Sequence, residues 1–262
     1  MLSSDGRLEV RLAAGADDVR AAQALRYRVF YDEMGAEPTP AMAKARLDFD
    51  RFDSICDHML VIDHSRPKED AVVGTYRLLR SDVEAKAGCG YYSADEYDLS
   101  PIIRQLQKHN GCEVGRSCVH REHRNNVTIQ FLWRGLARYY LDHNTTRIFG
   151  CASFFGTDPS VHALPLSYLH HYHLAPADAR VRAVPGRYQR MDYLSKDEID
   201  VRAAIRAVPP LIRAYLRLGG VCGDGAVIDR QFRTTDVFVA LFMEDVPEKY
   251  HDFYEREVAQ AS

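Results

Sequence analysis

No apolar stretch in this sequence approaches the roughly 20 residues that a membrane-spanning helix requires. We therefore expect a protein that is dissolved in water or, at most, peripheral to a membrane. The first residues, Met1 to Val10, are largely polar and lack the apolar segment of a secretory leader. Together, these two absences predict a cytoplasmic protein.

The sequence also has few features of disulfide-bonded, nucleic-acid-binding or metal-binding proteins. The six cysteines form no Cys-x-x-Cys pair, so reduced thiols are expected. No run of five or more basic residues occurs, and the net charge of -3 gives no reason to expect a nucleic acid partner. The cluster His170-His171-x-His173 has adjacent histidines that point apart on a helix, and no matching ligand set is evident. No metal site is predicted.

What remains is the composition of an ordinary globular protein. Of the 262 residues, 46% are hydrophobic and 27% are charged, which is enough to fill a sizeable core. Alternation predicts strands at 8–12, 58–63, 72–80, 112–120, 147–152, 226–228 and 237–242. Helical periodicity predicts helices from Asp17 to Met34, at 99–109, 125–144 and 158–171, from about 197 to 218, and finally at 247–257. A long acidic loop is predicted at 37–57. This order predicts one α/β domain with a mixed sheet.

The most informative segment is the strand-like run from Glu113 to Arg124, which precedes the longest amphipathic helix. Strict alternation would place Glu113 on one face of the strand and Arg116 on the other. A carboxylate and a guanidinium in a central strand are costly unless they are paired or used. Two interpretations of these charged residues are possible at this point. One is an internal ion pair that fixes the strand register, and the other is a cradle for an acyl donor at the end of the strand.

This arrangement resembles the GNAT acyltransferase superfamily, whose fourth strand binds the pantetheine arm of the donor and whose next helix begins at the donor's phosphate. The segments Leu25–Phe30, Asp48–Asp53 and Gly74–Leu79 are similar to patterns of the acyl-homoserine-lactone synthases. A wider set of segments resembles the bacterial ornithine lipid N-acyltransferases, often labelled hemolysin-like: Arg26–Phe30, Cys56–His58, Gly115–Val119, Phe149–Phe154, Pro209–Arg217 and Gly223–Ala226. The similarity runs from about Arg26 to Val246.

The resemblance implies a fold class and a function. The fold is an α/β, GNAT-type single domain over residues 1–262, with a mixed, mostly antiparallel central sheet flanked by helices. A C-terminal extension of that fold runs from about residue 194 to 262. The function is transfer of a 3-hydroxy fatty acyl group from acyl carrier protein to the α-amino group of ornithine, which gives lyso-ornithine lipid. No permanently bound cofactor is implied, only the phosphopantetheine arm of the carrier protein.

The segment Arg124–Ile129 bears on the identity of the donor. In coenzyme-A-dependent members of the superfamily, glycines in this loop let the backbone approach the pyrophosphate. Here Val127 and Ile129 stand at the glycine positions, and their branched side chains would obstruct a pyrophosphate. A carrier protein's arm has one phosphodiester, which Arg124 and the helix N-terminus could hold. The segment therefore favours acyl carrier protein over acyl-CoA.

The predicted donor-binding residues lie on the strand and the following helix: Ser117, Cys118, Val119, Arg124, Asn125, Asn126, Arg134 and Arg138. At about 100° per residue, Leu132, Leu136 and Tyr139 form the inward stripe of the helix. Arg124, Arg134 and Arg138 cluster on the opposite face, where an acidic carrier protein could dock. An ordinary solvated helix face explains these arginines equally well.

Acyl transfer to an amine needs a neutral nucleophile, a polarised thioester carbonyl and a leaving thiolate that is protonated or tolerated. Glu113 and Arg116 are the predicted catalytic residues. Glu113 occupies the carboxylate position that many GNAT members use, so it is the predicted base, and its alternative role is an ion pair with Arg77 or Arg116. Backbone N–H groups near Cys118 and Val119 are expected to polarise the carbonyl. Cys118 itself is not expected to act as a nucleophile.

The predicted acceptor site consists of Arg26, Phe30, Asp48, Asp50, Asp53, Arg77 and Ser153. Guanidinium groups bind carboxylates in a bidentate manner, so Arg26, Arg77 and Arg116 are candidates for the carboxylate of ornithine. The three aspartates suit its side-chain ammonium. Phe154 and Phe155 could line a channel for the acyl tail, although core packing explains them equally well.

Three other functions are compatible with parts of this sequence. The same chemistry could act on another amino acid, such as glycine or glutamine. An acyl-homoserine-lactone synthase shares the N-terminal segments, but those enzymes are shorter and lack the segment at 194–246. A pore-forming protein, which the hemolysin label suggests, is disfavoured because no leader and no amphipathic membrane segment are found.

Overall fold

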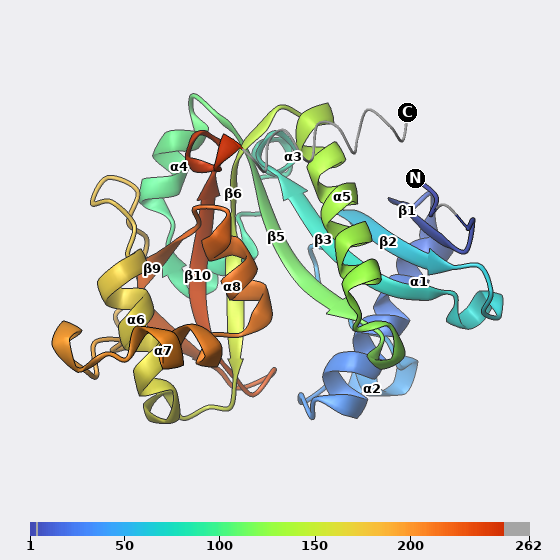
Figure 1. Ribbon diagram of the computed structural model, residues 1–262. Helices are drawn as coiled ribbons and strands as arrows, with labels where there is room; N and C mark the ends of the chain where they lie inside the picture. Colours follow the sequence, from blue (N-terminus) through green and yellow to red (C-terminus); the bar gives the residue numbers. More distant parts are fainter. Residues whose placement is uncertain (4, 249–262) are drawn as a thin grey trace. The chain divides into compact units, whose positions relative to one another are not determined.

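The computed structural model describes residues 1–3 and 5–248 of the chain. Helices flank a mixed sheet (Figure 1), so the predicted α/β fold class is confirmed. The described chain divides into two compact units, each built from separate stretches of sequence. Unit 1 contains residues 1–87 and 114–145, and unit 2 contains residues 88–113 and 146–247. A single domain with a C-terminal extension stays a prediction.

The strands are β1 (Leu8–Leu12), β2 (Asp57–Asp63), β3 (Val72–Arg80), β4 (Tyr97–Asp98), β5 (Asn110–Val119), β6 (Thr145–Phe155), β7 (Arg182–Ala183), β8 (Tyr188–Gln189), β9 (Val221–Asp229) and β10 (Thr234–Phe242). The α-helices are α1 (Ala16–Tyr27), α2 (Pro40–Ala45), α3 (Ser81–Ala87), α4 (Ser100–Leu106), α5 (Asn126–Asp142), α6 (Ala163–His173), α7 (Val201–Ala207) and α8 (Pro210–Arg217). A π-helical segment, η1 (Arg28–Glu33), follows α1 directly. The short 3-10 helices are η2 (Lys68–Asp70), η3 (Tyr92–Asp95), η4 (Arg121–His123), η5 (Pro159–His162), η6 (Lys196–Glu198) and η7 (Met243–Asp245).

In unit 1, β1, β2 and β3 are antiparallel neighbours, and β5 follows β3 in the sheet order. Strand β2 is buried at successive positions, which places apolar side chains on both of its faces. Both faces are covered because α1 and α5 each pack against β2 and β3. The strands predicted at residues 58–63 and 72–80 are therefore confirmed, and both are largely buried.

Helix α5 approaches its strands closely because a glycine lies at the contact. A Cβ atom on Gly135 would lie 2.6 Å from the Sδ of Met59 and 2.6 Å from a Cγ of Val10, so a larger residue would force a shift. The predicted inward stripe of this helix is confirmed. Its three members, Leu132, Leu136 and Tyr139, are all buried.

In unit 2, β6, β10 and β9 are antiparallel neighbours. Strand β7 is parallel to β9 and antiparallel to β4, and β8 is antiparallel to β9. The sheet is therefore mixed and mostly antiparallel, as predicted. Strand β10 is buried along its whole length, α8 packs against it, and α6 packs against β9 and α7.

Two predicted helix boundaries were wrong for local reasons. Helix α1 begins at Ala16, directly after Gly15, and not at Asp17, and no side chain caps it. The neighbouring Asp18 accepts hydrogen bonds from Arg11 and from the Ala14 N–H (2.8 Å) instead. The helix predicted from about 197 to 218 is two helices, α7 and α8, because Pro209 and Pro210 lack the N–H that a continuous helix requires.

The predicted loop at 37–57 was only partly correct, because it contains α2. Thr39 caps this helix by accepting a hydrogen bond from the Met42 N–H (3.3 Å), and Pro40 stands in its first turn. Residues 249–257 of the predicted final helix lie outside the described residues. Within residues 1–3 and 5–248, no helix is long and apolar enough to cross a bilayer.

Candidate active site

Unit 1 holds a buried ring of charges that contains most of the predicted acceptor residues. Arg26 on α1 is fully buried, and its guanidinium lies 2.7 Å from Asp48 and 2.7 Å from Asp53. Arg77 on β3 lies 2.6 Å from Asp50 and 3.0 Å from Asp53. The aspartates come from the loop between α2 and β2. Sequence segments that are far apart in the chain are thus joined by ion pairs.

Arg116 on β5 closes the ring, at 3.2 Å from Asp48 and 3.1 Å from Asp50. Each of the three aspartates is therefore shared by two arginines, and the charges of the ring balance. Burial alone would raise the pKa of Asp53, but the charges of Arg26 and Arg77 hold it well below its ordinary range. Asp53 is therefore ionised at neutral pH, and the pairing within the ring avoids the cost of isolated buried charges.

This pairing bears on the predicted acceptor roles of the ring residues. Their charged groups lie close together because they form ion pairs with one another, so an amino-acid substrate would have to compete with these internal pairs. Asp50 has a side chain that is 21% exposed, and the other ring side chains are below one-tenth. Phe30 lies on η1 and packs partly buried against the core of unit 1. Their acceptor roles stay predictions.

Arg116 also has an unusual backbone. Its φ of 51° lies in the left-handed region, which is uncommon for a residue with a side chain and marks a local irregularity in β5. The strict alternation predicted for this strand therefore does not continue through Arg116. This conformation costs about 1–3 kcal/mol. It is accompanied by the ion pairs with the two aspartates.

Glu113, the predicted base, belongs to the part of β5 that lies in unit 2. Its side chain is buried, and its carboxylate accepts hydrogen bonds from the Tyr92 N–H (2.8 Å), the Ser93 N–H (2.8 Å) and the Ser93 hydroxyl (2.5 Å). These bonds hold the start of η3 against the strand. A structural role of Glu113 is therefore visible, and its role as a base stays a prediction.

The start of α5 contains the predicted phosphate-binding residues. Asn125 caps the helix by accepting from the Thr128 N–H (3.0 Å), so Val127 and Ile129 lie within its first turn. Their side chains are 53% and 40% exposed. Arg124 precedes the helix and forms a bidentate ion pair with Glu33. Arg124 therefore does not share the helix face of Arg134 and Arg138, contrary to the prediction.

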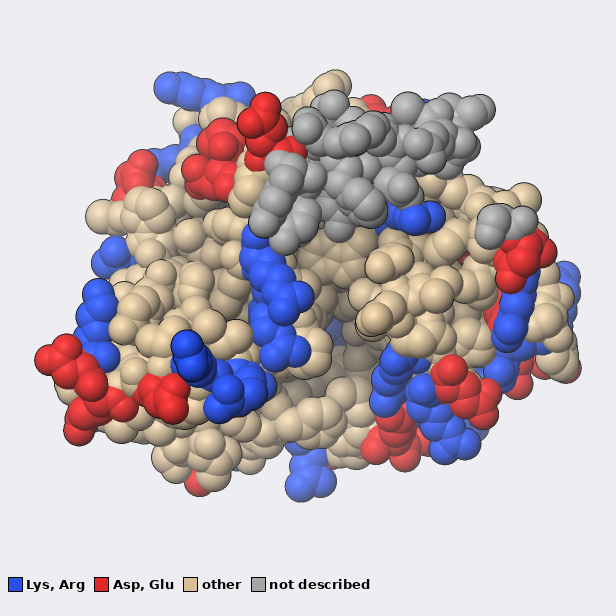
Figure 2. Space-filling model, in the orientation of Figure 1, with Lys and Arg blue, Asp and Glu red and all other residues tan. Residues whose placement is uncertain are grey.

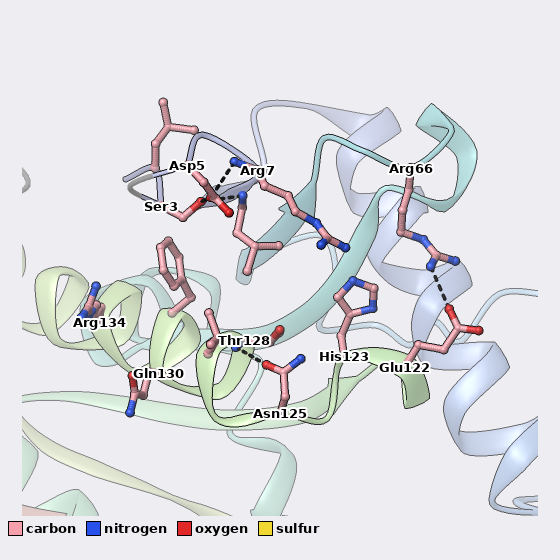
Figure 3. A pocket seen from close by; sticks show the side chains of 14 residues that line it. Ser3, Asp5, Arg7, Arg66, Glu122, His123, Asn125, Thr128, Gln130 and Arg134 are labelled. Carbon is pink, nitrogen blue, oxygen red and sulfur yellow. Dashed lines mark hydrogen bonds and ion pairs between the residues drawn. The ribbon is translucent and has the colours of Figure 1, made fainter.

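A cavity of about 710 Å³ lies beside this helix N-terminus (Figure 3). Two predicted donor residues, Asn125 and Arg134, line it. The opposite wall is formed by residues from the N-terminal segment and by Arg66, which pairs with Glu122 at 3.0 Å. The cavity thus combines basic and apolar groups at the end of a long helix.

Cys118 lies inside unit 1, and burial raises the pKa of its thiol to about 12. A thiol with such a pKa is almost fully protonated at neutral pH and is a poor nucleophile. An acyl-enzyme intermediate on Cys118 is therefore disfavoured.

Comparisons with known proteins agree with the pattern at β5 and α5. A family model described as an acetyltransferase (GNAT) domain matches residues 25–134. An L-ornithine N(alpha)-acyltransferase of Brucella abortus is 46% identical over 97% of this chain and 91% of its own length. One of Rhodobacter capsulatus is 46% identical over 95% of each chain. The chain belongs to the L-ornithine N(alpha)-acyltransferase family.

Membership of this family makes the protein an acyltransferase of the GNAT type. A solved coenzyme-A-dependent acyl-homoserine-lactone synthase, BjaI, is similar in fold, with a TM-score of 0.51. The match covers 97% of this chain and 89% of that one, at 12% identity. The likeness supports the fold and carries nothing further about the donor or the acceptor.

Sequence reasoning missed a group of charged residues in unit 2. Glu96, Asp229 and Asp236 are buried, and among the described residues they are the group close enough to share one cation. Three carboxylates separated by up to 140 positions give no sequence pattern, so only the folded chain reveals them. Ser153, a predicted acceptor residue on β6, pairs directly with Asp236 on β10.

Proposed function

We propose that this protein transfers a 3-hydroxy fatty acyl group from acyl carrier protein to the α-amino group of L-ornithine, giving lyso-ornithine lipid. The observation that carries the proposal is the 46% identity, over nearly the full chain, to proteins named L-ornithine N(alpha)-acyltransferase. The carrier protein is a transient partner, and the phosphopantetheine arm is part of the substrate. Any association with a membrane is peripheral in this proposal.

The chemistry is a direct transfer. The neutral α-amine attacks the thioester carbonyl, the C–N bond forms, the C–S bond breaks, and the thiol of the arm leaves with a proton. Glu113 accepts the proton that the amine must lose, and backbone N–H groups of Cys118 and Val119 stabilise the developing oxyanion. The thiol of Cys118 takes no part, because it is buried and protonated.

The overall reaction is tested by incubating the purified protein with 3-hydroxyacyl carrier protein and ornithine and analysing the products by mass spectrometry. We expect N-acylornithine carrying the acyl group on the α-nitrogen. Glycine, glutamine and S-adenosylmethionine, offered separately, should give little product. Preferred acylation of glycine or glutamine would move the protein to a different acceptor, and a lactone from S-adenosylmethionine would make it a homoserine-lactone synthase.

The donor preference provides a sharper test. Acyl carrier protein should be used with at least about tenfold higher catalytic efficiency than acyl-CoA of equal chain length, because Val127 and Ile129 occupy positions where a pyrophosphate would need glycine. The double variant Val127→Gly/Ile129→Gly should gain activity with acyl-CoA. A glycine in a helix costs about 1 kcal/mol, so thermal unfolding must be measured in parallel. Equal efficiency of wild-type protein with both donors would contradict this proposal.

The docking of the carrier protein is assigned to the exposed face of α5. Arg138 forms an ion pair with Asp142 at 2.9 Å, and Arg134 lies over the ring of Phe131 at 5.6 Å. Reversing the charges of Arg134 and Arg138 should raise the KM for the carrier protein more than it changes kcat, and added salt should weaken the wild-type interaction.

A matched control is available in unit 2. Figure 2 shows Lys and Arg side chains over α7 and α8, where Arg202 and Arg206 are exposed. The same reversal at these two arginines should have the smaller effect on KM. If the α7 reversal raises KM as much as the α5 reversal, or if neither does, the assignment of the docking face to α5 is wrong.

A further inference from the structure

One face of the sheet in unit 2 carries a group of polar side chains that are not part of the charged ring in unit 1. In antiparallel strands, directly paired residues point to the same face, and so do residues two apart along a strand. Asp236 pairs with Ser153, and Thr234 pairs with both Asp229 and Phe155. These five side chains therefore share a face. Ser153 is exposed and Phe155 is 58% exposed, so the face opens to solvent at this end of β6.

Glu96, which directly follows η3, completes the acidic group. Each of Glu96, Asp229 and Asp236 offers one carboxylate oxygen, and these oxygens all lie within 4.8 Å of one another. All three side chains are buried. Arg187 contacts the group, with its Nη2 2.9 Å from a Glu96 oxygen. The hydroxyl of Thr234 is more than nine-tenths buried on the same face and has no hydrogen-bond partner in the described chain.

The pKa of Glu96 depends on groups from several neighbouring segments. Burial first, and then the charges of Asp236 and Asp229, raise its pKa to about 7, although Arg187 acts in the opposite direction and the Cys151 thiol donates to it at 3.3 Å. Glu96 is therefore placed beside two like charges as well as beside Arg187. In the ring of unit 1, by contrast, arginines and aspartates balance in number.

A cavity of about 570 Å³ lies beside two members of this group. Glu96, Asp229 and Arg187 line it, and so does Tyr92, whose N–H donates to Glu113. The charges of Glu96 and Glu113 also both raise the pKa of the buried Cys151 thiol, after burial itself. The acidic group and Glu113 thus face one region of unit 2.

We propose that Glu96, Asp229 and Asp236 bind the side-chain ammonium of the amino-acid acceptor. This inference rests on the proposed function, in which the acceptor is ornithine. An ammonium has three N–H donors and no acceptor, which matches three carboxylates. With each oxygen about 2.8 Å from a tetrahedral nitrogen, the oxygens would lie about 4.6 Å apart, and in this structure their separations do not exceed 4.8 Å. The hydroxyls of Thr234 and Ser153 border the site.

An organic ammonium fits this site better than a divalent metal ion does. A guanidinium already bonds to Glu96, and a divalent metal ion at the same carboxylates would repel it about twice as strongly as a singly charged ammonium does. A metal ion at about 2.0–2.6 Å from its ligands also draws the oxygens much closer together than an ammonium does. Binding of the ammonium favours the ionised form of Glu96, so part of a proton is released to the solvent as the cation enters near neutral pH.

The test is equilibrium binding by calorimetry, which is independent of turnover. The two ligands are ornithine and 2-aminopentanoate, which has the carbon skeleton of ornithine without the terminal ammonium. The wild-type protein should bind ornithine at least about tenfold more tightly. Asp236→Asn and Glu96→Gln should each weaken ornithine binding by about ten- to a hundredfold and leave 2-aminopentanoate nearly unchanged.

The control is Asp178→Asn, which removes an exposed carboxylate elsewhere in unit 2 and should not change the preference for ornithine. Asp50→Asn tests the competing assignment, because Asp50 is a predicted acceptor residue and carries the most exposed carboxylate of the ring in unit 1. Under the present inference Asp50→Asn keeps the preference for ornithine. Thermal unfolding identifies any variant that fails to fold, and Thr234→Val offers a milder change in the same site. If Asp50→Asn abolishes the preference and Asp236→Asn does not, the ammonium binds in unit 1 and the inference is overturned.

Failure of this inference can be told apart from failure of the proposed function. If the wild-type protein does not acylate ornithine, 1,4-diaminobutane, a simple diammonium, is the binding probe. Its binding to wild type and its loss in Asp236→Asn would still support a cation site. No binding of 1,4-diaminobutane would overturn it, and so would binding of Ca²⁺ or Mg²⁺ that depends on Asp236 and competes with ornithine.

Discussion

Replacing Glu113 with glutamine should lower kcat for ornithine acylation by about 10² to 10⁴-fold, because an amide cannot take the proton from the acceptor ammonium. The rate of the variant should recover as the pH rises, because the solvent then deprotonates the amine. The measurement is a steady-state pH profile with acyl carrier protein and ornithine. A variant whose rate stays within threefold of wild type at neutral pH would show that Glu113 is not the base.

The hydrogen bonds of Glu113 require a control for structure. A glutamine places an NH₂ group where one donor of η3 now finds an oxygen, so the variant should also lose about 1–3 kcal/mol of stability. Ser93→Ala removes only the hydroxyl that donates to Glu113 and keeps the carboxylate. Ser93→Ala should reduce stability with a small effect on kcat. Equal losses of kcat in both variants would mean that Glu113 acts by holding η3 in place.

Replacing Arg26 with methionine should destabilise the fold by about 3–5 kcal/mol, because it leaves two buried carboxylates with half of their ion pairs. Arg26 is fully buried between Asp48 and Asp53, so water cannot replace the lost partner. The free energy of unfolding in urea measures the effect. This loss is large compared with the total stability of an ordinary domain, which is about 5–15 kcal/mol.

The matched control is Arg138→Met, which breaks an exposed pair with Asp142 four residues away on α5. Pairs of this kind contribute about 0.3–0.5 kcal/mol. A double variant, Arg26→Met with Asp53→Asn, should recover part of the loss, because it removes one of the stranded charges. If Arg26→Met costs no more than Arg138→Met, the ring contributes little to stability and its arginines are free to serve a substrate.

The fold could be predicted where periodicity is strong and local. The alternation at 8–12 and the stripe of Leu132, Leu136 and Tyr139 were sufficient, because burial of one face determines both patterns. The prediction of helix boundaries failed where single residues determine where a helix begins or ends. Pro209 and Pro210 split one expected helix, and Thr39 begins a helix inside an expected loop. The two-residue strands β4, β7 and β8 have no periodicity to detect.

Several residues of the candidate site could be predicted from the sequence, but the contacts among them could not. The resemblance singled out Arg26, Asp53 and Arg77, and the structure brings them together. Their mutual pairing could not be predicted, because a sequence does not show which buried charges face each other. The acidic group of unit 2 was missed for the same reason. Thr234 and Asp229 become neighbours only through the register of β9 and β10.

The way in which the two units alternate along the chain affects how the protein is made. Residues 88–113 of unit 2 leave the ribosome before residues 114–145 of unit 1. Neither unit can be finished until the chain has returned to it, so its contacts form between distant segments and late in synthesis. No single cut of the chain separates one unit from the other. A deletion series would therefore yield fragments with incomplete cores, and only a rearranged gene that joins both segments of a unit could release it intact.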